Sequence, residues 1–393
     1  MGKFRFDLLT TSDDARLGRI QTPHGDIETP AFMPVGTQGS VKGISPAELY
    51  ALEAQIILGN TYHLFVRPGM DVIRHLGGLH RFMNWNGPIL TDSGGYQIFS
   101  LAKIRKITEE GAHFQNHLDG TPTFISPEIA MEMQATLGSD IAMVLDECPP
   151  YPCAYEYAAR SLEMTARWAK RCVTAFRRDG VTASEATDAD TPARPHADTR
   201  LLFGIVQGGT FEDLRRASAE ATVQIGFDGY AIGGVSVGEP EPEMMQAVEW
   251  SEPFLPNDKP RYAMGLGTPP QLLELIARGV DMFDCVLPTR LARNGTAFTG
   301  RGTLNLKNAE FILQKGPIEE GCICPACSEF SRSYIRHLIK AEEILGLRLI
   351  TLHNLHFYLD LMRRARVAIE TGAFESFRRD FVAGYQNQNL PEG

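Results

Sequence analysis

Six polar or glycine-rich segments each lie at or near the end of a short apolar run of the chain. They are residues 92–97 (DSGGYQ), 146–148 (DEC), 207–209 (QGG), 233–235 (GGV), 264–265 (MG) and 284–285 (DC). Carboxylates accept hydrogen bonds from ring N–H and amino groups, and glycine backbone donates to a carbonyl. An aromatic side chain such as Tyr96 and a soft one such as Met264 can lie against the two faces of a ring. Together the segments predict a site for a flat, hydrogen-bonding heterocycle.

The acidic members of this set that bear on catalysis are Asp92, Asp146 and Asp284. If one of these carboxylates binds the ring, the other two are available for catalysis at a glycosidic bond, one as nucleophile and one as general acid and base. A single Asp after a strand more often caps a helix or shapes a turn, and Gly-Gly pairs are usually turns. Their joint occurrence after six apolar runs favours a catalytic site over these alternatives.

A second group of residues has the spacing of metal ligands. Three of the seven cysteines form a C-x-C-x2-C cluster at Cys322, Cys324 and Cys327, and His353 follows. Three cysteines this close together suit a metal better than a disulfide framework, and Cys3His is a tetrahedral zinc set. Because four protein ligands leave no open position for water, we expect structural Zn2+ rather than catalytic Zn2+. The alternative is a chance cluster.

Eight apolar runs provide the elements that must position these side chains. They are residues 31–35, 56–58, 89–90, 141–145, 202–206, 230–232, 262–264 and 282–286. Amphipathic segments that begin with good helix N-terminal signals lie between most of them. Short buried strands that alternate with helices indicate a parallel sheet, and eight such units favour an α/β fold of the (β/α)8 TIM-barrel type. No G-x-G-x-x-G motif follows the first run, which argues against a dinucleotide-binding fold.

The pattern is interrupted in ways that predict a domain organisation. Residues 1–286 are expected to form the barrel, with an N-terminal β-hairpin lid and a hairpin inserted at residues 96–126. Residues 287–350 are too long for a barrel loop and are expected to form an inserted zinc-binding subdomain. Residues 351–393 are expected to be C-terminal helices that pack on that subdomain and on the barrel. Residues 182–199 have the composition of a polar loop.

The net charge of −10 excludes uniform attraction to a nucleic acid or an anionic membrane. Residues 290–366, however, contain 12 Lys and Arg against 7 Asp and Glu, whereas the first 289 residues carry a net charge of −13. This basic segment is where an RNA backbone could lie. Arg290 and Arg293 are the best candidates for phosphate contacts, and Lys42 is a weaker one. For most of the twelve, the alternative is an ordinary solvated helix face.

The chain has no apolar run near the roughly 18 to 20 residues that a membrane helix needs, and its first residues lack the apolar core of a signal peptide. The cysteine pattern fits a reducing compartment. We therefore expect a protein of the cytoplasm with no membrane partner.

Several long motifs resemble the tRNA-guanine transglycosylase family, in its bacterial form. They are TDSGGYQ (91–97), DEC (146–148), GIVQGG (204–209), GYAIGGVSVGE (229–239), MFDCVLPTRLARNG (282–295) and CICPAC (322–327) with HN at 353–354. They occur in order over nearly the whole chain. The resemblance implies a glycosyltransferase of queuosine biosynthesis that exchanges the wobble guanine, position 34, of GUN-anticodon tRNAs (Asp, Asn, His, Tyr) for the 7-deazaguanine preQ1.

The resemblance also implies roles for single residues. Asp284 would be the nucleophile that attacks the ribose C1′ and forms a covalent tRNA–enzyme intermediate, and Asp92 would be the general acid and base. The remaining roles are base reading by Asp146, Gln207 and the amide of Gly234, and stacking by Tyr96 and Met264. A base must leave the anticodon stack to reach such a pocket. The family further implies a homodimer in which one subunit anchors the tRNA for the other, and no nucleotide or redox cofactor.

The choice of deazaguanine depends on a few positions. Cys148 and Val237 resemble the bacterial pattern that takes preQ1, and the carbonyl of Val235 would face its aminomethyl group. Family members often have Leu at that position, and Thr268 replaces a Lys that is common in bacterial members. Alternatives are a queuine-using transglycosylase, a non-catalytic tRNA-binding paralogue, which would be expected to lack Asp284 or the Asp92 motif, and a barrel hydrolase acting on a free nucleoside.

Overall fold

All eight predicted apolar runs form parallel strands in the computed structural model, which describes residues 5–101, 105–182 and 200–385. The strands are β4 (Ala31–Met33) with β5 (Val35–Gly36), β6 (Ile57–Gly59), β7 (Ile89–Thr91), β11 (Ile141–Met143), β12 (Leu201–Val206), β13 (Gly229–Ile232), β14 (Arg261–Ala263) and β15 (Met282–Asp284). Strands β4 and β5 belong to one run, divided at Pro34, whose nitrogen cannot donate a hydrogen bond. Because β15 pairs with β4 and β5 pairs with β6, the sheet closes. The predicted (β/α)8 barrel is confirmed.

The barrel strands are mostly apolar because both of their faces are covered. Every residue of these strands is buried except Asp284, the last residue of β15, which is half-buried. Large, fully buried side chains such as Phe32, Phe203 and Phe283 come from the strands themselves. Polar groups therefore enter the barrel only where a strand ends, and this restricts any chemistry to the two ends of the barrel.

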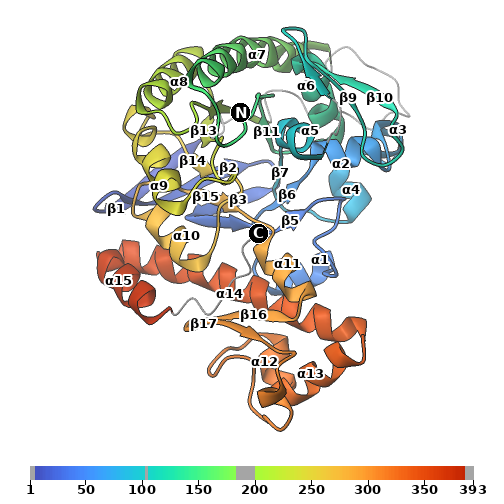
Figure 1. Ribbon diagram of the computed structural model, residues 1–393, viewed down its shortest axis with the longest axis vertical. Helices are drawn as coiled ribbons and strands as arrows, with labels where there is room; N and C mark the ends of the chain where they lie inside the picture. The colour runs from blue at the N-terminus through green and yellow to red at the C-terminus, as the bar shows by residue number, and fades with distance from the viewer. Residues whose placement is uncertain (1–4, 102–104, 183–199, 386–393) are drawn as a thin grey trace.

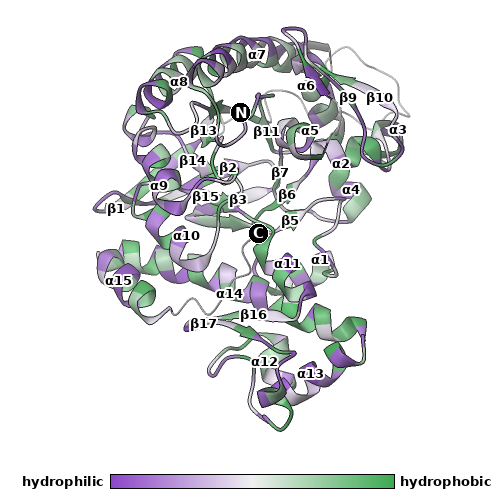
Figure 2. Ribbon diagram, viewed as in Figure 1, coloured by the Kyte–Doolittle hydropathy of each residue, from purple (hydrophilic) through white to green (hydrophobic). Residues whose placement is uncertain are grey.

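Helices cover the outside of the barrel (Figure 1). They are α1 (Pro46–Ala51), α2 (Thr61–Val66), α3 (Met70–His75), α4 (Leu79–Met83), α5 (Gly95–Leu101), α6 (Pro127–Leu137), α7 (Tyr155–Thr182), α8 (Glu212–Ile225), α9 (Glu241–Glu249) and α10 (Pro269–Ile276). Ser45 and Glu48 form a capping box at the start of α1, and Thr268 and Gln271 do the same for α10. Figure 2 shows hydrophilic and hydrophobic residues alternating along α7 and α8, as expected for helices with one buried face.

The predicted N-terminal lid is an antiparallel sheet of three strands, β1 (Phe6–Ser12), β2 (Ala15–Thr22) and β3 (Gly25–Thr29). Arg16 on β2 lies 3.2 Å from the carboxylate of Asp281, which precedes β15. His24, in the turn after β2, lies 2.7 Å from the carboxylate of Asp140, which precedes β11. Both acidic residues stand where a strand begins, so the lid covers the amino-terminal end of the barrel and leaves the other end open.

The predicted insertion after the third strand contains α5 and a second antiparallel sheet. Its strands are β8 (Arg105–Ile107), β9 (Ala112–Gln115) and β10 (Pro122–Ile125), in the order β10-β9-β8. Thr182 ends α7, and the rest of the predicted polar loop at residues 182–199 lies outside the described residues.

The chain after the barrel forms a smaller unit below it in Figure 1. Its elements are α11 (Leu287–Arg293), β16 (Thr296–Thr299), β17 (Gly302–Asn305), α12 (Pro325–Glu329), α13 (Arg332–Lys340), α14 (Ile344–Glu370) and α15 (Phe374–Gly384). Helix α14 packs against α11, α12 and α13 and also against β1, β2 and β4, so it joins the smaller unit to the barrel. Because α14 continues across residue 350, the division of the chain at 286 and 350 stays a prediction.

Among the described residues, no helix combines the length and the apolar character that crossing a membrane requires.

Candidate active site

A cavity of about 510 Å3 opens where the barrel strands end. Most of the residues singled out from the sequence for the base site line it, among them Asp92, Tyr96, Asp146, Cys148, Gly234, Val235, Met264 and Asp284, and so does Arg290. They belong to five segments that lie at the ends of different strands, and the closed barrel brings these segments to one place. This is the carboxyl-terminal end of the strands, where barrel enzymes carry their reactive groups.

Asp92, directly after β7, is held by two donors from the end of the neighbouring strand β6. The side-chain amide of Asn60 donates to one carboxylate oxygen, and the backbone N–H of Thr61 donates to the other over 2.8 Å. Burial raises the pKa of Asp92 to about 6, and the negative charge of Asp284 adds to that rise, while both hydrogen bonds oppose it. A carboxyl with a pKa near neutrality can both give and take a proton.

Asp284, at the end of β15, accepts two hydrogen bonds at the same oxygen. The hydroxyl of Tyr262 donates to Oδ1 over 2.6 Å, and the backbone N–H of Gly265 donates to it over 2.8 Å. Oδ2 takes part in neither bond and is the oxygen available for other chemistry. Burial raises the pKa of Asp284, and the two hydrogen bonds limit that rise.

Asp146, after β11, is held from two sides. Ser93 donates to Oδ1 over 3.2 Å, and the side-chain amide of Gln207 donates to Oδ2 over 2.6 Å. Burial raises the pKa of Asp146 to about 6. A Cβ at residue 95 would lie 2.7 Å from the carbonyl oxygen of Asp146, so the glycine there permits this close approach. Gln207 is fully buried beside the cavity, and its Oε1 has no hydrogen-bond partner within the described structure.

Two of the predicted residues are suited to contact with a flat ring. Tyr96 is 45% exposed and lines the cavity, and Met264 is half-buried. Cys148 also lines the cavity, but burial raises the pKa of its thiol well above the usual range. A thiol held in its neutral form is a poor nucleophile, so Cys148 contributes shape to the cavity rather than reactivity.

Glu147, between two cavity residues, turns away from the cavity. Its carboxylate accepts hydrogen bonds from the hydroxyls of Tyr157, over 2.6 Å, and of Ser161, both on α7. Its backbone N–H donates to Thr165 on the same helix. Side chains alternate in direction after β11. Asp146 and Cys148 therefore line the cavity, whereas Glu147 points away from it and links this segment to α7.

The three basic residues predicted to contact RNA lie in different surroundings. Arg290 is exposed and lines the cavity, whereas Arg293, on the same helix α11, is exposed and does not line it. Lys42 is half-buried and lies close enough to His63, a cavity residue, that its charge helps lower the pKa of that imidazole, after burial and His117. The structure thus places Arg290 in the cavity wall and the other two beyond it.

Several residues of the site were missed from the sequence. Asn60 directly follows β6, so the search for polar residues at strand ends, which found the other site residues, could also have found Asn60. Tyr262 lies inside β14, where an aromatic residue is typical core, and no signal marked its hydrogen bond to Asp284. Glu239 is buried and accepts hydrogen bonds from the backbone N–H groups of Ser236 and Val237. Its role in shaping that loop depends on a backbone turn that the sequence does not reveal.

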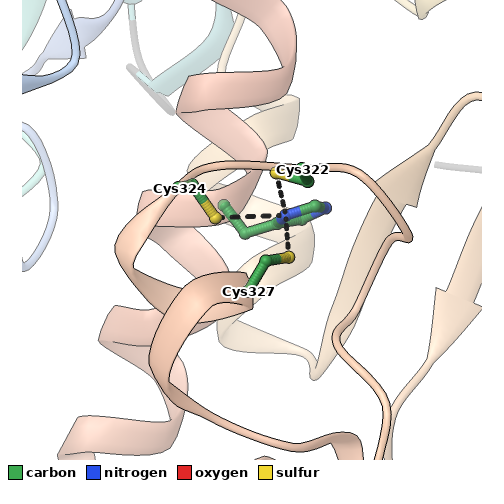
Figure 3. Close-up of side chains that lie close together, drawn as sticks. Cys322, Cys324 and Cys327 are labelled. Atoms are coloured by element: carbon green, nitrogen blue, oxygen red, sulfur yellow. Dashed lines mark hydrogen bonds between the residues drawn. The ribbon is translucent and has the colours of Figure 1, made fainter.

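The predicted metal ligands come together in the smaller unit. The Nδ1 atom of His353 lies 3.7, 3.6 and 3.3 Å from the sulfurs of Cys322, Cys324 and Cys327, and Figure 3 shows these sulfurs pointing toward one another. Ligands at zinc–sulfur and zinc–nitrogen distances and a tetrahedral angle are about 3.5 Å apart. The Nε2 atom of His353 lies 2.6 Å from the carbonyl oxygen of Phe298, which fixes its hydrogen there and frees Nδ1. The four residues could hold a metal ion.

A second group of possible ligands, His24, His80 and Asp140, lies at the amino-terminal end of the barrel. Its Nδ1–Oδ1 distance of 2.7 Å, between His24 and Asp140, is that of a direct hydrogen bond, and the two imidazole rings stack 3.8 Å apart. This group is explained by hydrogen bonding that fastens the lid to the barrel.

A closed (β/α)8 barrel whose carboxyl-terminal cavity is lined by three carboxylates is the framework of a barrel enzyme. The sequence model of one family, described as queuine tRNA-ribosyltransferase, matches residues 11–387. The chain is also 55% identical over 371 residues to queuine tRNA-ribosyltransferases from Staphylococcus aureus strains JH9, N315 and USA300, across 94% of this chain and 93% of each relative. The chain therefore belongs to the queuine tRNA-ribosyltransferase family of enzymes.

Replacing Asp92 by asparagine tests whether folding raises the pKa of this carboxyl. The pKa of Asp92 is raised from 3.8 to about 6 in the folded chain, so its ionisation destabilises the fold as the pH rises through this interval. The penalty is complete above pH 6 and amounts to at most about 3 kcal/mol. We expect Asp92→Asn to raise the free energy of unfolding by about 1 to 3 kcal/mol at pH 8 and to change it little near pH 4, measured by urea denaturation.

The control is Asp71→Asn, because the side chain of Asp71 is 99% exposed on α3. That variant should show no comparable rise in stability between pH 4 and pH 8. A loss of stability in Asp92→Asn at pH 8 would contradict the assigned state of the carboxyl.

Proposed function

We propose that this enzyme exchanges guanine 34 of GUN-anticodon tRNAs for preQ1 by double displacement, with Asp284 as nucleophile and Asp92 as acid and base. The observation that carries the proposal is the pair of carboxylates in one cavity, each oriented by its own two donors. Exchange of one glycosidic bond for another needs no energy source, so these two groups suffice for the chemistry.

In the first displacement, Oδ2 of Asp284 attacks C1′ of the ribose while the bond from C1′ to the guanine breaks. Asp92 donates a proton to the departing base, so guanine leaves neutral and a covalent ester remains between Asp284 and the ribose. In the second displacement, Asp92 takes a proton from the incoming base, whose nitrogen attacks C1′ and releases Asp284. The pKa of Asp92, about 6, suits both steps near neutral pH.

The base would be read by groups at the ends of neighbouring strands. Asp146 accepts from the ring N–H and the amino group, the free Oε1 of Gln207 offers a further acceptor, and the amide of Gly234 donates to the carbonyl of the base. Tyr96 and Met264 lie against its faces. Removing one of these bonds leaves a buried polar group unpaired, which gives strong discrimination between bases.

The loop from residue 233 to residue 239 supports preQ1 as the incoming base. The N–H of Ser236 donates to Glu239. Because N–H and C=O point in opposite directions in a trans peptide, the carbonyl of Val235 faces away from Glu239, where it can accept from an aminomethyl group. Val237 lines the same cavity and limits the room for a bulkier substituent such as that of queuine. The relatives carry queuine in their name, and queuine is the alternative that a competition assay separates.

The tRNA partner and the assembly belong to the same proposal. Residues 290–366, with their net charge of +5, offer the surface for the RNA backbone, and Arg290 in the cavity wall offers the contact nearest the reacting nucleotide. Large apolar side chains are exposed on the smaller unit at Ile312, Leu313, Tyr334 and Ile344. A second copy of the chain would cover these side chains, so we propose a homodimer whose second subunit anchors the tRNA. The cysteine pattern, which fits a reducing compartment, supports the cytoplasm as the location of the enzyme.

Zinc is the metal that the Cys3His set suits best. Cys322, Cys324, Cys327 and His353 would hold one Zn2+ per chain and so fasten the loop before α12 to helix α14. When bound, the ion supplies a structural cross-link to the smaller unit and takes no part in the exchange.

The central test is guanine exchange by the purified protein. Wild type should incorporate radiolabelled guanine into tRNA-Tyr, preQ1 should compete better than queuine, and Asp284→Asn should lower the rate by about a thousandfold or more because the covalent step is lost. The control is Asp281→Asn, a buried Asp at the opposite end of the barrel. Release of guanine without incorporation would favour a hydrolase, and full exchange by Asp284→Asn would refute the nucleophile.

Removal of the metal tests the zinc assignment. A stripped protein should contain no zinc, melt about 10 °C lower than the native one and bind tRNA less tightly, since the smaller unit loses its cross-link. Cys327→Ser should reproduce the loss of zinc, whereas Cys153→Ser, at a half-buried cysteine outside the cluster, should retain one zinc per chain. An unchanged melting temperature after complete zinc removal would contradict a structural role.

A further inference from the structure

We propose that helix α8 sets the base selectivity of the cavity from behind, through Arg215 and Ser218, two positioning residues that hold the groups facing the base. The inference rests on the proposed function, because it concerns how guanine is read. Neither residue lines the cavity, and both are buried on the face of α8 that packs behind it.

Arg215 is fully buried and directs its guanidinium at main-chain carbonyls. Nε donates to Gly209 over 2.6 Å, Nη1 donates to Gly233 over 2.6 Å, and Nη2 donates to Gly234 over 3.0 Å. A longer contact of 3.5 Å joins Nη1 to the carbonyl of Val206. Within the described part of the chain the guanidinium makes no direct ion pair, and its charge is stabilised by carbonyl dipoles at the ends of β12 and β13 together with the more distant carboxylate of Glu239.

These bonds fix the direction of the amides that face the base. In a trans peptide the N–H points opposite to the C=O of the same peptide unit. Holding the carbonyl of Gly233 toward Arg215 therefore turns the N–H of Gly234 away from it, and holding the carbonyl of Gly234 does the same for the N–H of Val235. Gly234 and Val235 line the cavity. A cation on the carbonyl also polarises the peptide, which strengthens the N–H as a donor.

The backbone at Gly234 does not by itself fix the direction of the neighbouring N–H groups. Its φ of +61° lies in the left-handed region, and a Cβ there would lie 2.3 Å from Oε1 of Gln207. A glycine has many accessible conformations, so an external group must select one of them. Burial lowers the pKa of Arg215 to about 10, so the guanidinium remains charged at neutral pH and can do this.

Ser218, one turn further along α8, holds the other base-reading segment. Its hydroxyl oxygen accepts from the backbone N–H of Gln207 over 2.9 Å. Gln207 in turn donates to Asp146 over 2.6 Å. A Cβ at residue 208 would lie 2.7 Å from the backbone nitrogen of Arg215, so the glycine there lets α8 approach this closely. One helix thus positions both the acceptor side, through Ser218, and the donor side, through Arg215, of the base-reading edge.

The test separates base recognition from stability and from tRNA binding. In guanine exchange with tRNA-Tyr, Arg215→Lys should raise the KM for guanine by about tenfold or more, because a lysine cannot hold three carbonyls in a fork. Ser218→Ala should raise it by about threefold, through loss of one hydrogen bond. The KM for tRNA should change by less than about threefold in both variants, since phosphate contacts dominate RNA affinity.

Arg261→Lys is the matched control. Arg261 is equally buried and binds the main-chain carbonyl of Leu255, but it lies at the amino-terminal end of the barrel. This variant should lose stability and keep the wild-type KM for guanine. Should Arg215→Lys fail to fold, Ser218→Ala decides.

A KM for guanine that stays within about twofold of wild type in the folded variants would overturn the inference, as would an equal rise in Arg261→Lys. Wild-type protein that does not exchange guanine would instead refute the proposed function, and the inference with it.

Discussion

Desolvation of three carboxylates at one end of the barrel is the constraint on which the rest of the site depends. Asp92 and Asp146 follow strands β7 and β11, and Asp284 is the last residue of β15; all other residues of these strands are buried. Water that would stabilise the charge of the three carboxylates is therefore largely excluded. Desolvation is the main cause of the rise in each pKa. Each carboxylate is therefore held by donors supplied by the protein, and in Asp284 both donors bind Oδ1 and leave Oδ2 for the substrate.

The supporting structure follows from that requirement. The donors come from neighbouring strand ends, as Asn60 after β6 does for Asp92 and Gln207 after β12 does for Asp146. Helix α8 holds the glycine backbone through Arg215, and α7 anchors Glu147. The lid covers the amino-terminal end of the barrel, and α14 joins the barrel to the unit that carries the cysteine cluster. A site of charged groups thus lies on a rigid apolar frame, as catalytic groups require.

The periodicity and spacing of apolar residues predicted the barrel and the polar side chains that lie at its strand ends. Eight apolar runs gave the barrel, and the strand-end rule located Asp92, Asp146 and Asp284. Glu147, which lies between Asp146 and Cys148, had no predicted role, and side-chain alternation turns it toward α7. Tyr262 and Arg215 could not be predicted: a tyrosine within a strand is typical core, and a helix arginine is typical surface. Their roles depend on long-range contacts that neither composition nor period encodes.

The central claim is that Asp284 forms the covalent bond to the ribose. Its most direct test is to quench the enzyme in acid during exchange with an anticodon stem-loop, digest the RNA and map the remaining nucleotide on the protein by peptide mass spectrometry. The account predicts a single modified peptide with the added mass on Asp284. The same mass on Asp92 or Asp146, or exchange with no modified peptide at all, would contradict it.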